Sequence, residues 1–296
     1  MSFSSPIFSI VIPTYNRAHL IASTIESVLE QNFRDFEVLI IDDGSNDNTE
    51  DVVNKFKNES IRYYKKENAE RGAARNFGAT RAKGQYINFF DSDDLMYPHH
   101  LIAAYNLIQS LERPEFFHLA YDHKHEDGTF LGNSQLPGDA VKDVILFDNK
   151  LSCNGIFLRK DIAGQFPFEE DRALSSSEDW ELWIRLVSRF KLHTSNEITS
   201  TVINHDNRSL HTIDARTVVA RDLVFIDRLK ADPEVMLTYG ASFGRFVAER
   251  FTFFMLCFAA EKQRRKVWKW GFKALKVHPP ILLSKRFLAS IKNSLK

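Results

Sequence analysis

The chain has 296 residues, of which 44% are hydrophobic and 26% are charged, which allows one large folded domain with an appendage and argues against disorder. Its 39 basic and 39 acidic residues cancel, and its two cysteines, Cys153 and Cys257, lie far apart in apolar surroundings, which gives neither a disulfide framework nor a metal-ligand spacing and favours a reducing cytoplasm. The longest apolar run, FTFFMLCFAA, is about half of the ~20 residues that span a bilayer, and the N-terminus lacks a signal-peptide pattern, so we expect no transmembrane segment.

The first hundred residues alternate between short apolar runs and amphipathic segments. In chain order the predicted elements are a strand 7–13, a helix 17–31, a strand 36–42, a helix opened by Asp47 and Glu50 at the spacing of a capping box, a strand 61–64, a helix 71–83, a strand 86–90 and a helix from Pro98. This alternation predicts βαβ units around a parallel sheet with both faces covered, which explains why the strands are uniformly apolar.

The alternation weakens beyond residue 116. The later predicted elements are a hairpin with its turn at Gly128, a helix 177–190, a strand 197–205 and, from about Asp214, helices only. We therefore expect a main domain over residues 1–214 and a helical extension over residues 215–296. This extension is basic, because from Lys262 to Lys296 the chain has eleven basic residues and no acid, which hints at an anionic partner.

Three polar clusters follow predicted strands: PTYNR after the first, DDGSND after the second and DSDD after the fourth. Ligands bind outside the carboxyl ends of the strands in open sheets of this kind, so we expect the clusters to meet in space. Neither a G-x-G-x-x-G fingerprint nor a Walker A loop is present, so a phosphate would be held in another way.

The acidic clusters suit a hard divalent cation such as Mg²⁺ or Mn²⁺. In the DSD stretch, one of Asp91 and Asp93 would bind the metal and the other a hydroxyl of the ligand, and the metal would neutralise a diphosphate. The alternative is that acidic turns only cap the next helix. Asp47 fits that alternative, whereas Asp42 and Asp43 at the end of the second strand are left without a structural reason.

Four ordered motifs, FSIVIPTYNR, FEVLIIDDGSNDNT, RGAARNFGATRAKGQYINFFDSDD and SSSEDWELWIRL, resemble those of the inverting glycosyltransferases of family 2 over roughly residues 7 to 210. The resemblance implies an α/β fold of the GT-A type, a Rossmann-like, mostly parallel sheet flanked by helices, here with the C-terminal helical extension. It also implies a catalytic domain over residues 1–214 that binds a nucleotide-diphosphate sugar, with UDP as the leading nucleotide.

The resemblance implies nucleotide contacts from several of these motifs. They are Thr14, Tyr15, Arg17, Asp43, Arg71 and Asp91. The threonine, the tyrosine and the first aspartate would line the nucleoside pocket, where the aspartate accepts a hydrogen bond from the base. Arg71 lies in the segment that often supplies a basic contact to the nucleotide, and Arg75 and Lys83 are alternatives to it.

Mn²⁺ or Mg²⁺ is the implied cofactor. Asp93 would be a metal ligand, with Asp94 as the alternative for that role. His205 falls where many members of the family have a histidine near the metal or the diphosphate. The alternative for His205 is a histidine that is only hydrogen-bonded at a strand end.

Asp179 matches the aspartate that serves the family as general base, in an acidic pair with Glu178 ahead of a helix. The alternative for the pair is helix capping, with Ser175 and Glu178 as a capping box, which leaves Asp179 unexplained. Glu178 and Trp180 are the candidate contacts to the acceptor. Trp180 and Trp183 are one turn apart, which fits a core stripe as well as a platform for a sugar ring.

The implied reaction is a single in-line displacement that moves a sugar from a UDP-sugar to a hydroxyl of a glycan or lipid-linked saccharide and inverts the anomeric configuration. A sugar nucleotidylyltransferase is one alternative, but it would need a Gly-rich loop after the first strand, and PTYNR is not one. A non-catalytic homologue that binds nucleotide or glycan is another. It would be expected to lack the acid before the tryptophan helix, whereas Asp179 is present.

The basic extension has two explanations. Basic amphipathic helices with Trp and Leu can lie in the interface of an anionic membrane, where a lipid-linked acceptor would be found. The other explanation is an appendage that packs its apolar face on the catalytic domain. We expect a cytoplasmic protein, peripheral on the inner face of the membrane in the first case, and nothing in the motifs calls for nucleic acid.

Overall fold

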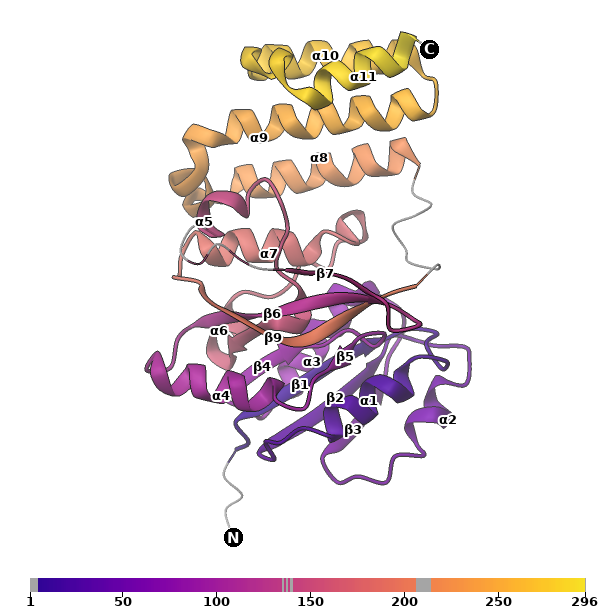
Figure 1. Ribbon diagram of the computed structural model, residues 1–296, viewed down its shortest axis with the longest axis vertical. Coiled ribbons are helices and arrows are strands. Elements are labelled where there is room, and N and C mark those ends of the chain that lie inside the picture. The colour runs from indigo at the N-terminus through magenta and orange to yellow at the C-terminus, as the bar shows by residue number, and fades with distance from the viewer. Residues whose placement is uncertain (1–4, 135, 137, 139–140, 206–213, 296) are drawn as a thin grey trace. The chain divides into compact units, whose positions relative to one another are not determined.

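The computed structural model describes residues 5–134, 136, 138, 141–205 and 214–295, and its chain divides into two compact units, Met1–Asp206 and Asn207–Lys296 (Figure 1). The first unit carries the sheet, and the described part of the second consists of helices. The predicted boundary near residue 214 lies at the end of the segment 206–213, which is outside the described residues.

One mixed sheet forms the centre of the first unit. Its described strands are β1 Phe8–Thr14, β2 Phe36–Asp42, β3 Ile61–Lys65, β4 Tyr86–Phe89, β5 Leu95–Met96, β6 Phe116–His125, β7 Phe130–Ser134, β8 Ile156–Arg159 and β9 His193–Asn204. They lie in the order β3-β2-β1-β4-β8-β6-β9-β5, with β7 paired to β6. The pairs among β3, β2, β1 and β4 are parallel, as predicted. Beyond β4 the sheet is mixed, because β8 enters antiparallel between β4 and β6.

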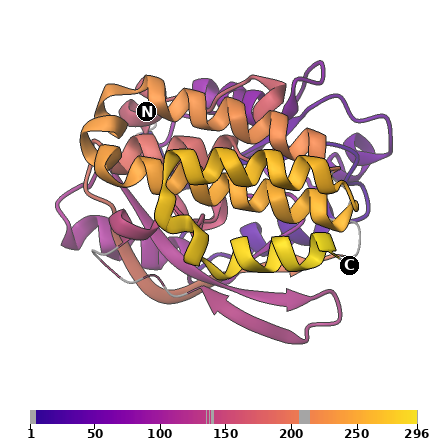
Figure 2. The same ribbon diagram turned by 90° about the horizontal axis from the view of Figure 1, so that it is seen from above.

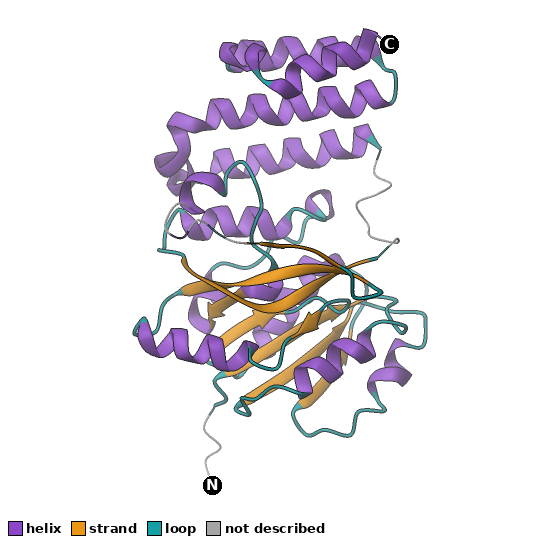
Figure 3. Cartoon of the chain, viewed as in Figure 1, coloured by secondary structure: helices purple, strands orange, loops and turns teal. Residues whose placement is uncertain are grey.

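Helices cover both faces of this sheet. In chain order the helical elements are α1 Ile21–Leu29, α2 Thr49–Val53, α3 Glu70–Arg81, α4 His100–Ser110, α5 Val141–Val144, η2 Cys153–Gly155, α6 Lys160–Gln165, η3 Arg172–Leu174 and α7 Glu178–Val187. α1, α2 and α4 lie on one face, where Ile10 and Ile12 of β1 share a buried core with Ile25 of α1 (Figure 3). Alternate residues of a strand point to opposite faces, so β1 is buried along its whole length.

The other face of β1 and β2 carries α3. The helix approaches these strands closely because residue 78 is a glycine. A Cβ at Gly78 would come within 2.3 Å of Val11 Cγ1 and 3.2 Å of Ile41 Cγ1. This close packing positions the first two turns of α3, which carry Arg71 and Arg75, near the carboxyl ends of the strands.

Two local predictions at this edge are wrong. The helix predicted over residues 17–31 begins only at Ile21. The residues before it form a loop that bonds to the loop after β2, where Ala18 N donates to the Asp47 carboxylate at 3.1 Å. The capping box predicted from Asp47 and Glu50 is also absent. Asp47 Oδ1 accepts from the backbone N–H of Thr49, the first residue of α2, at 3.1 Å, and the N-cap residue Asn48 makes no side-chain capping bond.

The second unit consists of helices in its described part. They are α8 Ala215–Ala231, α9 Pro233–Ala260, α10 Arg264–Val277, the short η4 Pro279–Leu283 and α11 Lys285–Leu295. α9 packs against α8, α10 and α11 (Figure 2). Asp214 and Asp232 cap α8 and α9 by accepting backbone N–H groups of the first turn. Among the helices that the structure describes, none has both the length and the apolar character required to cross a bilayer.

Candidate active site

The polar clusters after β1 and β2 meet at the carboxyl edge of the sheet, as predicted. Asn16 N donates to Ser45 Oγ at 2.8 Å, and Asn16 Oδ1 accepts from Asn46 N at 2.9 Å. Arg17 N donates to Thr49 Oγ1 at 3.2 Å. Asn16 has a φ of 52°, a conformation that asparagine tolerates better than most residues. These bonds fasten the two loops to each other.

The residues predicted to line a nucleoside pocket differ in their burial and in their hydrogen-bond partners. Thr14 is buried, and its hydroxyl has no hydrogen-bond partner among the described residues. Tyr15 is exposed. The buried carboxylate of Asp43 accepts from Lys66 Nζ at 2.5 Å and from Ala69 N at 3.1 Å. Lys66 was not a candidate from the sequence, where its only signal is a basic residue directly after a strand.

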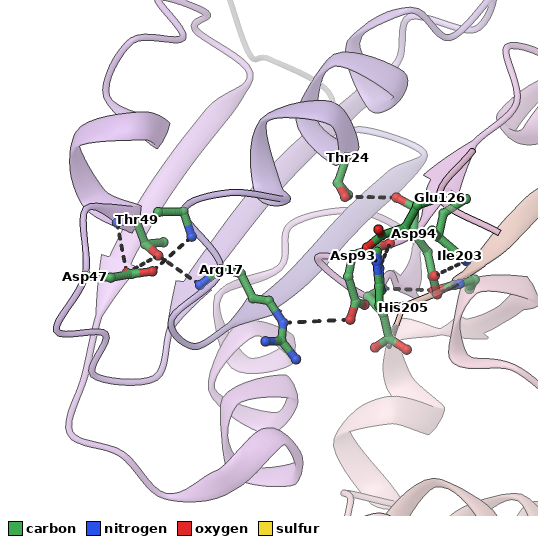
Figure 4. Close-up of polar contacts among 12 residues, drawn as sticks. Arg17, Thr24, Asp47, Thr49, Asp93, Asp94, Glu126, Ile203 and His205 are labelled. Atoms are coloured by element: carbon green, nitrogen blue, oxygen red, sulfur yellow. Dashed lines mark hydrogen bonds and ion pairs between the residues drawn. The ribbon is translucent and has the colours of Figure 1, made fainter. Parts of the chain in front are cut away.

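The aspartates that follow β4 have different environments. Asp91 is partly exposed and accepts from Arg75 Nη2 at 2.9 Å. The Asp93 side chain is 21% exposed, and its Oδ2 lies 3.7 Å from Arg17 Nε (Figure 4). Asp94 is buried. The cluster that appears uniform in the sequence is therefore divided between the site and the interior.

Asp94 has a structural role. Its Oδ2 accepts from Asn154 Nδ2 at 2.7 Å, and its Oδ1 accepts from Ile203 N at 2.8 Å. Burial, together with the charges of Asp93 and Asp91, raises the pKa of Asp94 well above its ordinary value. Asp94 thus joins the end of β4 to η2 and β9, and its two oxygens are already used. Of the two candidate metal ligands in this cluster, Asp93 is the one with a partly exposed carboxylate.

His205 lies beside Asp93. Its Nδ1 is 2.5 Å from Glu126 Oε1, and its Nε2 is 3.2 Å from the backbone carbonyl oxygen of Asp93 (Figure 4). Both ring nitrogens have partners in this arrangement, so the histidine is hydrogen-bonded at its strand end, and its metal-binding role stays a prediction. Glu126 was not a candidate from the sequence, because it follows β6 and comes near the site only through the pairing of β6 with β9.

A buried arginine connects Asp91 to the acidic pair on α7. Arg75 Nη1 donates to Glu178 Oε1 at 2.8 Å, and Arg75 Nη2 donates to Asp91 Oδ1 at 2.9 Å. The alternative explanation of Ser175 and Glu178 as a capping box is therefore wrong. Glu178 turns inward to the guanidinium, Ser175 Oγ donates to Glu70 at 3.1 Å, and α7 begins without a side-chain cap.

The structure separates the three basic candidates, of which Arg71 and Arg75 lie on α3. Arg71 is exposed at the start of the helix, and its Nε is 3.8 Å from Glu178 Oε1. Arg75 follows one turn later and is buried in the ion pairs described above. Lys83 lies beyond the other end of the helix, where its backbone N–H donates to Glu37 at the start of β2. Arg71 and Arg75 are therefore at the site, and Lys83 is not.

Asp179 lies on the first turn of α7. Its Oδ1 accepts from Trp180 N at 2.7 Å, and its Oδ2 accepts from Asn149 Nδ2 at 3.4 Å. Burial and the charge of Glu178 raise the pKa of Asp179 from 3.8 to about 6, although the charge of Arg75 acts in the opposite direction. A carboxylate with this pKa can hold or release a proton close to neutral pH.

The two tryptophans of α7 have separate roles. Trp183 is fully buried and packs edge-on against Phe168 with ring centroids 5.8 Å apart, so it is a core residue. Trp180 is partly exposed and donates its indole N–H to the carbonyl oxygen of Ile145 at 2.6 Å. Contact of Trp180 with an acceptor stays a prediction.

Comparisons with known proteins identify the family. A model described as glycosyl transferase family 2 matches residues 9–136, which include the clusters after β1, β2 and β4. WfaP of Escherichia coli, a UDP-Glc:α-D-GlcNAc-diphosphoundecaprenol β-1,3-glucosyltransferase, is 31% identical over 187 residues that cover 61% of this chain and 70% of WfaP. The chain belongs to glycosyl transferase family 2.

A second relative and a solved structure are also similar to this chain. A glycosyltransferase of Rickettsia typhi is 28% identical over 220 residues, which cover 70% of this chain and 67% of that protein. The crystal structure of residues 1–349 of Staphylococcus aureus TarS in complex with UDP-GlcNAc has a TM-score of 0.71 to this chain and is 18% identical, which confirms the GT-A type fold. The match covers 97% of this chain and 89% of that TarS fragment. Against three longer Rickettsia relatives, the match covers only 27% to 33% of their length.

The site of this family 2 member fits a divalent cation that would be bound by a protein carboxylate together with phosphate oxygens of a bound donor. Within the described residues, no three His, Cys, Asp or Glu side chains form a group that could hold a metal by themselves. Mg²⁺ in nucleotide sites is usually held by one or two carboxylates and by phosphate oxygens of the substrate. The Asp93 carboxylate is partly exposed and is too far from Arg17 Nε, at 3.7 Å, for a hydrogen bond, so it can take such a cation.

Proposed function

We propose that this family 2 glycosyltransferase moves a sugar from a UDP-sugar to a hydroxyl of a glycan or lipid-linked saccharide and inverts the anomeric configuration. The observation that carries the proposal is the Asp179 carboxylate, whose pKa of about 6 suits a general base at neutral pH. Asp179 is adjacent to Glu178, which Arg75 connects to Asp91. The name of WfaP contains UDP-Glc and a diphosphoundecaprenol saccharide, and TarS was solved with UDP-GlcNAc, which supports this donor and acceptor class.

In this proposal the donor base lies against the loops after β1 and β2. The buried Thr14 hydroxyl gains the partner that it lacks among the described residues, and Tyr15 offers an exposed ring for stacking. The Asp43 carboxylate keeps lone pairs for the base beyond those used by its present partners. Arg17 is partly exposed, Arg71 is exposed, and both carry positive charge for the diphosphate.

Asp93 is the proposed protein ligand of Mn²⁺ or Mg²⁺. When bound, the cation supplies positive charge that offsets the charge on the departing diphosphate. His205 joins the ligands only if its Nε2 leaves the carbonyl oxygen of Asp93, from which it is 3.2 Å away. Asp91, held by Arg75, is then free of the metal and binds a hydroxyl of the donor.

The proposed reaction is one displacement at the anomeric carbon. The acceptor oxygen forms a bond to that carbon while the bond from the carbon to the diphosphate oxygen breaks, and the electron pair leaves with the diphosphate. The proton of the acceptor hydroxyl passes to the Asp179 carboxylate. Glu178 is buried and paired with Arg75, so it positions Asp179. Trp180 is the more exposed of the two candidate contacts to the acceptor.

A donor screen tests this function. We expect UDP-sugars with Mn²⁺ to raise the Tm of the full chain more than GDP- or CMP-sugars do, because a ligand that binds only the native state stabilises it by about 2.7 kcal/mol at a hundred times its Kd. The best donor is then incubated without acceptor, and slow release of UDP is measured. NMR of the released sugar should show the inverted anomer before it equilibrates in water.

The control is Asp148→Asn, which removes an exposed carboxylate that pairs with Lys150. It should bind and hydrolyse the donor like the wild type, whereas Asp179→Asn should bind the donor and release little UDP. Donor binding without hydrolysis by the wild type, under any metal, would favour a non-catalytic nucleotide-binding protein.

A further inference from the structure

The C-terminal unit presents a concentration of large apolar side chains to solvent. They lie on α10, η4 and α11, with exposed fractions of 44% for Trp268, 68% for Phe272, 48% for Leu282, 82% for Leu283 and 55% for Leu288. Single exposed apolar residues need no explanation, but a group of this kind marks a surface that interacts with something. We call this group the apolar surface.

The packing of α10 inside its own unit does not account for the apolar surface. One side of α10 is buried on α9, where the Trp270 ring lies 4.9 Å from that of Phe254 and Val267 is fully buried. Trp268 and Phe272 are on a different side of α10, four residues apart, and their ring centroids are 6.3 Å apart. α10 therefore has two apolar sides, and packing on α9 uses one of them.

The apolar surface is hollowed between α10 and α11. A groove of about 550 Å³ is lined by Trp268, Leu282 and Leu288 of the apolar surface, and by Leu275, Phe287 and Ile291. Lys292 is the charged side chain that lines it. Such a groove can take an apolar chain as well as a flat apolar layer.

Every formal charge on the side chains of this part of the sequence is positive. From Lys262 onward the chain has eleven Lys and Arg residues and no Asp or Glu. The exposed ones on the two helices include Arg265, Lys269, Lys273, Lys276, Lys285, Arg286 and Lys292. The apolar surface is thus accompanied by positive charge, without a negative side chain in the same stretch.

We propose that the apolar surface binds an anionic lipid membrane. Trp268, Phe272 and the leucines would enter the boundary between headgroups and acyl chains, and the lysines and arginines would contact anionic headgroups. Long basic side chains suit this position because their stems cover apolar surface while their charged ends stay in water. The proposal does not depend on the proposed reaction.

Charge distinguishes a membrane from a second copy of this chain. In a symmetric dimer through the apolar surface, the same basic residues of both copies would face each other without acidic partners from this stretch. Anionic lipid instead supplies the missing negative charge. Charge complementarity therefore selects the membrane as the occupant.

The test is sedimentation of the full chain with vesicles of phosphatidylcholine, with and without phosphatidylglycerol. We expect binding to the anionic vesicles at low salt and a large loss of binding at about 0.5 M salt, where charges are screened within a few ångströms. Phe272→Ser with Leu283→Ser, both exposed, should weaken binding by about tenfold or more while circular dichroism stays unchanged. Lys269→Glu with Lys276→Glu should do the same through charge.

A matched control variant loses the same number of exposed apolar side chains, two, but outside the apolar surface. Leu237→Ser with Phe130→Ser removes side chains that are 81% and 58% exposed on α9 and β7, and it should bind vesicles like the wild type. Brominated lipid should quench tryptophan fluorescence of the wild type and quench it less in Trp268→Phe.

Three results would overturn the proposal. The first is absence of binding to anionic vesicles at low salt. The second is equal binding by the wild type and both double variants. The third is a dimer in sedimentation velocity that Phe272→Ser with Leu283→Ser dissociates, without lipid binding by the wild type, since the apolar surface would then join two copies.

Discussion

Replacing Asp179 with asparagine should make the protein more stable and nearly inactive. Burial and Glu178 disfavour the ionised carboxylate, whereas asparagine has the same shape without the charge. The asparagine amide can also keep the two hydrogen bonds of the Asp179 carboxylate. Its oxygen can accept from Trp180 N, and its N–H group can donate to Asn149 once that amide turns, because Asn149 Oδ1 is buried without a partner in the part of the chain that the structure describes.

The pKa of Asp179 sets the size of the effect. A rise from 3.8 to about 6 corresponds to about 3 kcal/mol of folding free energy. Because the side chain is partly exposed to solvent, we expect about 1 to 2 kcal/mol. Between these pKa values the native state binds the Asp179 proton more tightly than the unfolded state does. The free energy of unfolding of the wild type therefore falls as the pH rises and Asp179 ionises, which is an ionisation penalty that asparagine does not carry. The penalty is complete above about pH 6 and absent below about pH 4.

The assay compares thermal unfolding of the wild type and Asp179→Asn at pH 5 and at pH 8. The variant should have the higher Tm, with the larger difference at pH 8. Asp148→Asn alters a carboxylate that is 64% exposed and should leave the Tm unchanged at both pH values. Transfer by Asp179→Asn should fall by about 10² to 10⁴ with donor binding retained. A variant less stable than the wild type at pH 8, or one that transfers sugar at a similar rate, would refute the reasoning.

Three further outcomes follow from the site. The rate of transfer by the wild type should fall about tenfold per pH unit below about pH 6, because Asp179 must be ionised to accept a proton; a flat profile down to pH 5 would exclude it as the base. Arg75→Met should destabilise the protein by about 3 to 5 kcal/mol in urea unfolding, because it leaves Glu178 without its buried partner, and a loss under 1 kcal/mol would show that the pair is solvated. Asp93→Asn should remove the Mn²⁺ dependence of UDP binding measured by calorimetry, while Asp94→Asn, at a buried structural site, should mainly lower the Tm; the reverse pattern would exchange their roles.

The first half of the fold could be predicted because its elements carry their own local signals. The strands from β1 to β4 are short apolar runs between amphipathic helices, and each follows from its own residues. The antiparallel entry of β8 between β4 and β6 could not be predicted in this way. Its position depends on which strand edges are available for pairing, and a segment of four residues, Ile156–Arg159, does not encode its partner.

The site was predicted where a motif lies at a strand end and missed where distant side chains compete. The loops after β1 and β2 meet, as their positions after parallel strands require. The capping box of Ser175 and Glu178 fits its local pattern, but Arg75, 103 residues before Glu178, takes the carboxylate. The role of Lys66 could not be predicted for a related reason. Its hydrogen bond to Asp43 forms only because β2 and β3 pair and bring the two residues together.

The guanidinium shared by Asp91 and Glu178 has a consequence for how this chain can evolve or be re-engineered. In the proposed function, Asp91 faces the donor and Asp179 faces the acceptor, and substitutions near either residue would change the field around Arg75. Residues in one ion-pair network typically couple by about 0.5 to 3 kcal/mol, so the effects of such pairs should be epistatic. Donor and acceptor specificity are therefore best varied together in one library, because winners selected separately on each side will combine poorly.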